Sequence, residues 1–387
     1  MLRSIRLKNW KSFVDQELDL GALTLLSGQN GAGKSSILQA LLVLRQSYQQ
    51  KSLPKPGLSL QGDLAKLGTV EDVRYEYAVE DEGEIGLSWE HGQATWVFSI
   101  PSFSKEKLEG RYLELLSCPN EESLRGLSLF SDSSCQTLHA ERIGPRVSYG
   151  FSDLMVSTQR NIGTSGEFTA HFLSLYGEEK IQRKELLYPK EERNELKYQV
   201  EGWMSEVCPG TRLRLEAHPS LDQIQIRYAF HVKGGTETKR YRATHVGFGI
   251  TYTLPVLVAL LSSKPNDLVI LENPEAHLHP RGQRQLGRLL AKAASVGIQI
   301  IVESHSDHIL NGIRLEVAQG GLPPEKVALH FIERVSEEGE SFSWVESPQI
   351  DHAGRIEPWP KGFFDEITEG LGDLLRVEAA TQKDARR

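Results

Sequence analysis

Eight consecutive residues, Gly28 to Ser35, have the spacing of a phosphate-binding loop. They read Gly-Gln-Asn-Gly-Ala-Gly-Lys-Ser and fit the pattern G-x-x-x-x-G-K-[ST]. In such loops backbone N–H groups surround phosphate oxygens, the lysine reaches the β- and γ-phosphates, and the serine hydroxyl is offered to Mg²⁺. We therefore predict a binding site for a nucleoside triphosphate here. The residues expected to bind the phosphates are Asn30, Gly31, Ala32, Gly33, Lys34, Ser35 and Ser36.

Two apolar runs later in the chain end in residues that suit the same chemistry. Leu268–Leu271 is followed by Glu272, and Ile298–Val302 leads to His305. An acidic residue at the end of a buried strand is typical of a position that holds Mg²⁺ beside a phosphate loop. We predict that Glu272 joins Ser35 at the metal and that His305 senses the γ-phosphate.

Two further features carry weaker signals. The glycine-rich turn Gly247–Gly249 opens an apolar helix expected over 252–261, which makes it a second candidate anion site. Histidines also cluster in this part of the chain and raise the alternative of a zinc site, which the lack of an accompanying cysteine disfavours. These histidines are His277, His279, His305 and His308.

The phosphate loop needs a strand before it and a helix after it. Leu23–Ser27 is apolar and β-prone, and residues 36–44 have the apolar spacing of a helix. Residues 3–20 favour two short strands, in which Trp10 and Phe13 are expected in the core rather than against an adenine ring. Strand-like runs at 73–79, 85–89 and 94–100 predict an antiparallel sheet, and Gln61 is a candidate for a glutamine that touches Mg²⁺ and the attacking water.

The middle of the chain is less regular. Residues 167–207 are expected to be helical, 224–228 alternates like a strand, and no heptad run long enough for a coiled-coil arm is present. Arg142 and Arg146 follow a strand end, where they have two readings: contact with phosphate or a facing subunit, or a salt-bridged turn. The expected segments are an ATPase lobe at 1–100, a helical insertion at 101–240, the second part of the ATPase head at 241–335, and a C-terminal segment at 336–387, of which the last dozen residues are expected to be disordered.

Composition limits the choice of partners and compartment. The net charge of −8 and pI of about 5.9 argue against a surface that is basic all over, so nucleic acid would need a local patch. The cysteines Cys118, Cys135 and Cys208 lie too far apart for a zinc hook or disulfide framework. No signal peptide is recognisable and the longest apolar run is too short to cross a bilayer, so we expect a cytoplasmic protein with no membrane contact.

Together these motifs resemble those of the ABC-type ATPases of the SMC/RecF/OLD-like group, and most closely bacterial AAA-family ATPases that carry the domain of unknown function DUF3696. The resemblance rests on 8–13 with 28–35, on 247–249 with 272–280, and on 303–312 with the aromatic segment 359–365. It covers nearly the whole chain, 101–240 only loosely. It implies an α/β P-loop ATPase head with a mixed sheet, an antiparallel β subdomain and an α-rich insertion.

The resemblance also implies a homodimer, or a higher oligomer, with ATP and Mg²⁺ between the phosphate loop of one subunit and the Gly247–Gly249 turn of the other. Glu272 would be the second-motif acid and His305 the switch histidine. Three departures from the family pattern concern catalysis: Asn273 replaces the usual general base, Gly247 the signature serine, and His279 an aspartate. An amide cannot accept a proton from water. Either Glu275 substitutes for it, or hydrolysis is slow.

We therefore expect a weak ATPase that dimerises around ATP and gates a separate effector, such as a nuclease, or a nucleic-acid transaction. The family implies a setting in anti-phage defence. The alternative is a scaffold or sensor that binds ATP without hydrolysis. A self-contained nuclease is disfavoured because only about eighty residues follow His305 and they hold no D-x-D motif.

Overall fold

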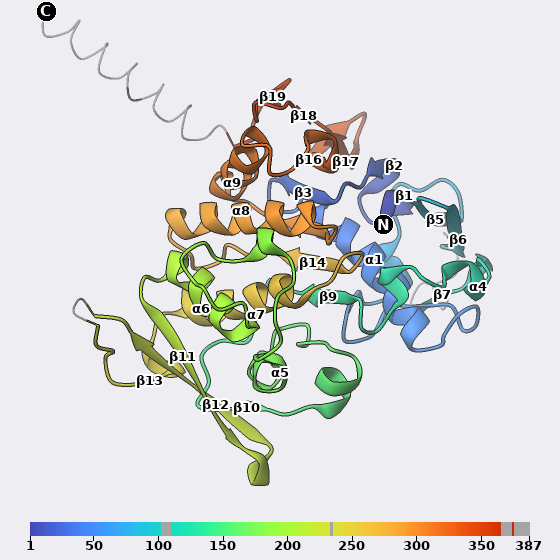
Figure 1. Ribbon diagram of the computed structural model, residues 1–387. Coiled ribbons are helices and arrows are strands. Elements are labelled where there is room, and N and C mark those ends of the chain that lie inside the picture. Colours follow the sequence, from blue (N-terminus) through green and yellow to red (C-terminus); the bar gives the residue numbers. More distant parts are fainter. Residues whose placement is uncertain (102–109, 233–234, 365–373, 375–387) are drawn as a thin grey trace, which may run out of the picture.

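The computed structural model describes residues 1–101, 110–232, 235–364 and 374 (Figure 1). Its centre is a six-stranded sheet in the order β17-β16-β3-β15-β14-β9, parallel except for β17. The strands are β3 (Leu23–Gly28), β9 (Cys135–Leu138), β14 (Leu268–Glu272), β15 (Gln299–Glu303), β16 (Val327–Glu337) and β17 (Glu340–Glu346). Because β3, β15 and β14 are parallel neighbours, their carboxyl ends meet at one edge of the sheet.

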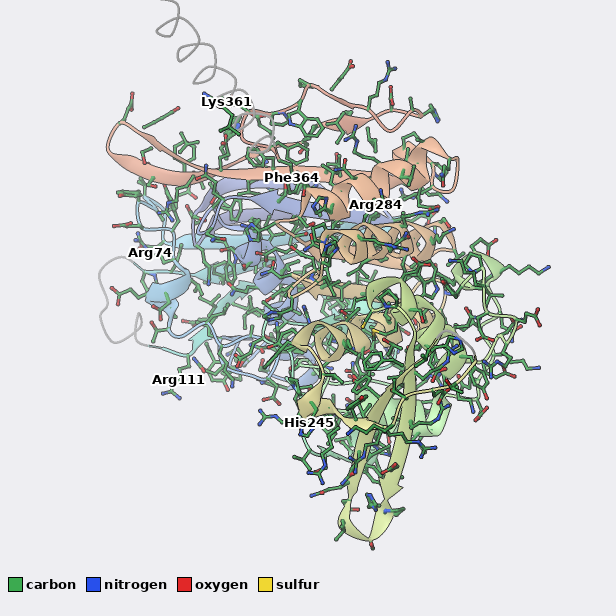
Figure 2. The ribbon with its side chains drawn as sticks, turned by 90° about the vertical axis from the view of Figure 1, so that its left-hand side faces the viewer. Arg74, Arg111, His245, Arg284, Lys361 and Phe364 are labelled. Atoms are coloured by element: carbon green, nitrogen blue, oxygen red, sulfur yellow. The ribbon has the colours of Figure 1, made fainter. Side chains whose placement is uncertain are left out.

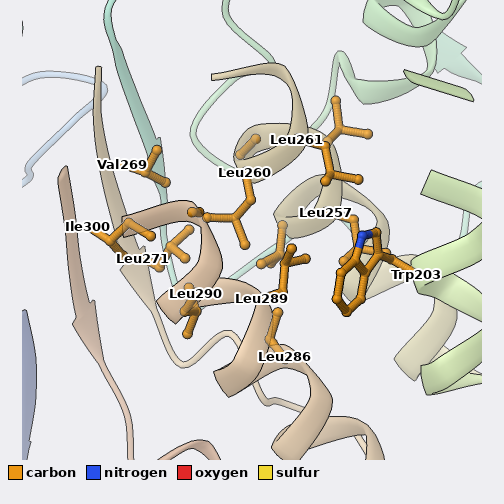
Figure 3. Close-up of a cluster of buried hydrophobic side chains, with 14 of the residues drawn as sticks. Trp203, Leu257, Leu260, Leu261, Val269, Leu271, Leu286, Leu289, Leu290 and Ile300 are labelled. Carbon is orange, nitrogen blue, oxygen red and sulfur yellow. The ribbon is translucent and has the colours of Figure 1, made fainter. Parts of the chain in front are cut away.

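The central sheet separates two hydrophobic cores, and successive side chains along each strand point alternately into one core and the other. Val269 and Leu271 face one core, whereas Leu268 and Ile270 face the other. Figure 3 shows the first core, where side chains of the strands meet those of the helices on that face. The helices of this face are α6 (Leu196–Val207), α7 (Phe248–Ser262), α8 (Pro280–Ser295) and α9 (Asp307–Ala318).

The second core lies under α1 (Lys34–Gln49) and an antiparallel sheet in the order β2-β1-β5-β6-β8. Trp10 and Phe13 are completely buried there, which confirms their expected place in the core. The strands of this sheet are β1 (Leu2–Trp10), β2 (Phe13–Asp19), β5 (Glu82–Trp89), β6 (Gly92–Ser99) and β8 (Leu115–Ser117). A mixed α/β ATPase head with an antiparallel subdomain is thus what the chain forms.

Two sequence-based expectations about local structure were wrong. Residues 73–79 form no strand: α2 (Val70–Val73) ends there, and the guanidinium of Arg74 donates to the carbonyls of Glu76 and Ala78, which folds the chain back on itself. The segment 101–240 is also less helical than expected. It supplies β9 to the central sheet and forms further strands of its own. It contains α5 (Thr169–Tyr176), α6 and most of a second antiparallel sheet, namely β10 (Tyr149–Gly150), β11 (Thr211–His218) and β12 (Gln223–Phe230). The fourth strand of that sheet, β13 (Tyr241–Arg242), follows directly after the segment.

The chain beyond α9 packs onto the central sheet. Phe363 is fully buried, with its ring 5.5 Å from that of Phe331 on β16, which confirms that the aromatic segment packs on the domain. The last dozen residues, expected to be disordered, lie outside the described part. The remaining short elements are β4 (Leu58–Ser59), β7 (Tyr112–Leu113), α4 (Glu121–Leu124), β18 (Gln349–Ile350) and β19 (Ile356–Glu357). No helix in the described residues is both long and apolar enough to span a bilayer.

Candidate nucleotide site

The phosphate loop connects β3 to α1 and depends on its glycines. Gly28, Gly31 and Gly33 have φ angles of 136°, 78° and 110°, a region that side chains rarely adopt. At Gly28 a Cβ would also lie 2.0 Å from the carbonyl oxygen of Ile332 on β16. A side chain at any of these three positions would strain the backbone, and at Gly28 it would also collide with β16. The bend of the loop therefore requires glycine.

Lys34 begins α1 and turns its ammonium back into the loop. Its Nζ donates to the carbonyls of Gly28 at 3.0 Å and Gln29 at 2.7 Å, and the residue is buried. Burial lowers the pKa of Lys34, while the carboxylate of Glu303 raises it. A buried cation held only by neutral carbonyls is well placed to exchange them for phosphate oxygens.

A pocket of about 630 Å³ opens over this loop. On its phosphate-loop side the lining residues are Asn30, Gly31, Gly33, Lys34, Ser35, Ser36, Asn273, Glu303 and His305. The remaining lining residues are Lys11, Ser12, Gln39, Asp72, Arg74, Tyr75, Glu76, Arg334 and Ser341. The structure thus gathers most of the predicted phosphate-binding residues with His305 in one cavity. Ala32, Glu272 and Glu275 are absent from its lining.

The carboxylate nearest to Ser35 belongs to Glu303, a residue that the sequence motifs did not single out. The hydroxyl of Ser35 donates to both carboxylate oxygens of Glu303, at 2.9 and 3.2 Å. Glu303 ends β15, the strand that lies directly beside β3. Burial raises the pKa of this carboxyl, and the hydrogen bond from Ser35 opposes that rise. The available signal was its position at the end of a buried apolar strand, the same signal that identified Glu272.

Glu272 lies one strand further from the phosphate loop. It ends β14 in register with Glu303, and its carboxylate accepts from the N–H of Ala140 at 3.2 Å and lies 3.3 Å from Nδ1 of His139. Arg142 fixes this strand end, since its guanidinium donates to the carbonyls of Glu272 at 2.8 Å and Asn273 at 2.7 Å. Burial lowers the pKa of Arg142 to about 10.

Of the two readings of Arg142, the structure therefore favours a structural one, although its partners are backbone carbonyls rather than a salt bridge. Arg146, in contrast, contributes its backbone N–H to the hydroxyl of Tyr149 at 3.3 Å.

Two buried oxygen atoms beside the pocket have no hydrogen-bond partner. One is Oδ1 of Asn273, a residue with φ of 43°, and the other is Oε2 of Glu275. The other oxygen of Glu275 accepts from the backbone N–H of His305 at 2.9 Å. Burial raises the pKa of Glu275. Buried polar atoms are almost always paired, so these two oxygens indicate water or ligand at this position.

His305 carries a neutral ring at the pocket wall. Burial lowers its pKa, the charge of Lys34 lowers it further, and a hydrogen bond with the backbone of Gly28 opposes the shift. A neutral imidazole has one N–H to donate, and a contact with a phosphate oxygen would require that N–H to leave the backbone of Gly28.

The donors at this edge fit Mg²⁺. The Ser35 hydroxyl and the Glu303 carboxylate are oxygen ligands that already lie within hydrogen-bond distance of each other, with Glu272 on the adjoining strand. Mg²⁺ is held in such sites by one or two carboxylates together with substrate phosphates and water. In the described part of the chain no three His, Cys, Asp or Glu side chains come together as an all-protein metal site.

The Gly247–Gly249 turn lies at a different pocket of about 510 Å³, which His245 and His277 also line. Gly247 precedes α7 with open space around its Cα, and the next residue, Phe248, exposes 55% of its surface. Figure 2 labels one residue of each pocket, Arg74 and His245, and they lie well apart. The two pockets share no lining residue, so within one chain this turn does not line the nucleotide pocket.

Gln61 lies away from the phosphate loop, contrary to the expectation that it approaches the metal. Its side chain donates to the carbonyl of Gly68 at 3.0 Å, and its own carbonyl accepts from Gln50, just beyond the far end of α1. A sixteen-residue helix is about 24 Å long. Among glutamines, it is Gln39, on the second turn of α1, that lines the pocket.

The histidines near Glu272 do not converge either. His277 packs against Tyr252, with ring centroids 4.8 Å apart, and Nδ1 of His279 accepts from the N–H of Arg281 at the start of α8. His308 lies beside Asp307 on α9.

Comparison with protein families gives three matches along the chain. Residues 4–125 match a model described as "AAA domain", and residues 173–311 match one described as "AAA domain, putative AbiEii toxin, Type IV TA system". Residues 322–374 match "Protein of unknown function (DUF3696)". The chain therefore carries AAA-type domains over 4–125 and 173–311, followed by a DUF3696 segment. No curated protein matches its sequence.

Comparison with solved structures finds SMC head domains. An SMC head bound to the C-terminal winged-helix domain of ScpA is 14% identical, with a TM-score of 0.51, covering 89% of this chain and 97% of that one. The SMC head of Thermotoga maritima is 15% identical (TM-score 0.43; 89% and 98% covered). An SMC head with an extended coiled coil bound to the C-terminal domain of ScpA, derived from Pyrococcus furiosus, is 13% identical (TM-score 0.49; 89% and 96% covered). The first of these likenesses supports an SMC-head fold.

Proposed function

We propose that this ATPase is a slow nucleotide switch that binds ATP with Mg²⁺, pairs with a second copy of itself around the nucleotide, and gates a separate effector. The observation that carries the proposal is the shared pocket of Lys34, Ser35, Glu303 and His305. In that pocket the loop amides and Lys34 would hold the phosphates, Ser35 and Glu303 would hold Mg²⁺, and His305 would contact the γ-phosphate. The Mg²⁺ would neutralise charge that develops during phosphoryl transfer.

The residues after Glu272 support slow turnover. Asn273 lines the pocket at the place of the family's general base but has no basic group. Glu275 is the nearest carboxylate with an unpaired oxygen, and the raised pKa that burial gives it suits a group that accepts a proton near neutral pH. However, it is nearly inaccessible and its other oxygen is engaged by His305. We assign Glu275 as the base of a weak ATPase.

Pairing of two copies would complete the site. The Gly247–Gly249 turn opens α7 with unobstructed space at Gly247 and an exposed Phe248, and it does not line the pocket over the phosphate loop of its own chain. In a head-to-head dimer this turn would meet the γ-phosphate bound by the partner, and each chain would bury one apolar ring. Higher oligomers built from such dimers are compatible with the same contact.

The proposed effector rests on the family description. The pocket provides for nucleotide, and the described residues contain no separate metal cluster for cutting nucleic acid. The match to a model named for a toxin of a toxin–antitoxin system supports a role in anti-phage defence beside a partner protein such as a nuclease. We include nucleic acid in this proposal only as a ligand of that partner protein.

The test compares three proteins in three assays. Wild type, Lys34→Ala and Glu275→Gln are compared for ATP affinity, steady-state phosphate release, and mass by light scattering with and without MgATP. We expect wild type to bind ATP, turn over slowly and dimerise; Lys34→Ala to lose all three; and Glu275→Gln to bind and dimerise without turnover. Tight ATP binding by Lys34→Ala would contradict the assignment.

A second candidate function is a scaffold that binds ATP without hydrolysis, and the amide at Asn273 is the observation that favours it. The same assay separates the two. A scaffold dimerises with ATP, shows no phosphate release in the wild type, and gives the same result for Glu275→Gln.

A further inference from the structure

The hairpin of β16 and β17 lies directly against the phosphate loop. β16 runs parallel to β3, with Phe331 opposite Ser27 and Ile332 opposite Gly28, so it follows the strand that enters the loop to its last residue. The chain then turns and returns as β17, whose Ser343 is buried at the loop itself. This hairpin falls in the segment matched by DUF3696.

Ser343 joins three parts of the site. Its hydroxyl donates to the carbonyl of Ala32 at 2.6 Å and contacts the hydroxyl of Ser12 at 2.6 Å, and its backbone N–H donates to the carbonyl of Ser12 at 2.7 Å. A Cβ at Gly33 would lie 2.5 Å from the same hydroxyl. The C-terminal hairpin therefore fixes the outer side of the phosphate loop and the turn between β1 and β2.

Beyond Ser343 the hairpin enters the pocket. Arg334 on β16 and Ser341 on β17 line the pocket, and Nε of Arg334 donates to the hydroxyl of Ser341 at 2.8 Å. Next to them the hydroxyl of Tyr75 donates to the carboxylate of Glu340 at 3.3 Å. Arg334 is exposed at the mouth, with its guanidinium oriented by this one serine.

We propose that Arg334 contacts the nucleoside end of ATP, so that the DUF3696 hairpin forms the base-side wall of the nucleotide pocket within the same chain. This inference rests on the proposed function. The phosphates are already provided for by the loop amides, Lys34 and Ser35, which leaves Arg334, a lining residue outside the loop, for the nucleoside. A planar guanidinium held at one nitrogen presents its face to a purine ring, and such stacking is a recognised mode of base recognition.

The alternative is that Arg334 pairs with a phosphate. The two contacts differ in which ligands they affect: stacking acts equally on ATP and ADP and has no effect on inorganic tripolyphosphate, whereas a phosphate contact weakens tripolyphosphate as well. Charge also separates them, because Lys retains the charge but lacks the plane.

The experiment measures the affinities of ATP, ADP and inorganic tripolyphosphate, each with Mg²⁺, by calorimetry on the full chain. The variants are Arg334→Ala and Arg334→Lys, with Arg284→Ala, an exposed arginine on α8 outside the pocket (Figure 2), as matched control. Melting temperatures check folding; Arg334 is exposed, so its loss should leave the fold intact.

We expect Arg334→Ala to weaken ATP and ADP alike by about 5- to 100-fold, the range of base stacking, and to leave tripolyphosphate unchanged. Arg334→Lys should recover little, and Arg284→Ala should match wild type. Equal ATP affinity in Arg334→Ala and wild type overturns this inference and leaves the proposed function intact, as does a parallel loss of tripolyphosphate. A wild type that binds none of the three ligands overturns both.

Discussion

The most informative perturbation concerns which carboxylate holds Mg²⁺. Motif position points to Glu272, whereas the geometry points to Glu303, whose carboxylate accepts the Ser35 hydroxyl at 2.9 Å. Glu303→Gln keeps the shape of the side chain and removes its charge, and Glu272→Gln does the same one strand away. The pair of variants therefore tests position with little change in packing.

The size of the effect follows from the contacts. A hydrogen bond to a charged group contributes about 1.5–3 kcal/mol, equivalent to about 10- to 150-fold in affinity. We expect Glu303→Gln to remove that factor from the Mg²⁺-dependent part of ATP binding. Glu272→Gln should have a smaller effect, because its carboxylate is engaged by Ala140 and His139.

The assay is ATP affinity in excess Mg²⁺ and in EDTA, with the ratio of the two as readout. For wild type this ratio should also fall as the pH is lowered, because Mg²⁺ needs the ionised carboxylate. Burial raises the pKa of Glu303, so the fall begins at a higher pH than for an ordinary glutamate near 4.5. The reasoning is refuted if Glu272→Gln abolishes the ratio while Glu303→Gln preserves it.

Three further outcomes are expected. Glu275→Gln should raise the free energy of unfolding at pH 7 by about 1 kcal/mol, since it neutralises a buried carboxylate whose pKa burial has raised, while lowering phosphate release; a less stable variant in chemical denaturation would argue against this. Arg142→Ala should lower the free energy of unfolding by roughly 2–5 kcal/mol in the same experiment, because the carbonyls of Glu272 and Asn273 lose a charged donor. Wild-type stability would show that these hydrogen bonds are dispensable. Gly33→Ala should lose ATP affinity and stability together. Adding Ser343→Gly should restore only the part due to the clash with Ser343, and neither the part due to the hydroxyl of Ser12 at 2.9 Å nor the part due to the φ of 110°.

The phosphate loop could be predicted because its signal is local. The glycines, Lys34 and Ser35 are consecutive, and the flanking strand and helix follow from apolar spacing within twenty residues. The same holds for the strand that ends at Glu272 and for the helix after Gly249. Each of these depends on residues that are neighbours in the sequence.

What the sequence did not reveal depends on strand order. β15 lies between β3 and β14, so the carboxylate that reaches Ser35 comes from Glu303 rather than from the motif residue. No local pattern states which of two acidic strand ends is nearer. The failure at 73–79 has another cause: Val73, Tyr75 and Ala78 are buried by a turn that Arg74 holds rather than by a strand, and Val79 is exposed. Likewise, nothing near Arg334 in the sequence signals that it lines the pocket.

The pairing of β16 with β3 has a consequence for how this protein is made. The strand that leads into the phosphate loop is synthesised near the start, yet its neighbour on one side, β16, follows roughly 300 residues later. At usual rates of translation the ribosome needs about 15–60 s to reach it. For most of that interval β3 has no partner on either side, because β15 begins only at Gln299, and unpaired strand edges invite pairing with other chains. A message truncated shortly after α9 would therefore yield an aggregation-prone product in place of a smaller working enzyme.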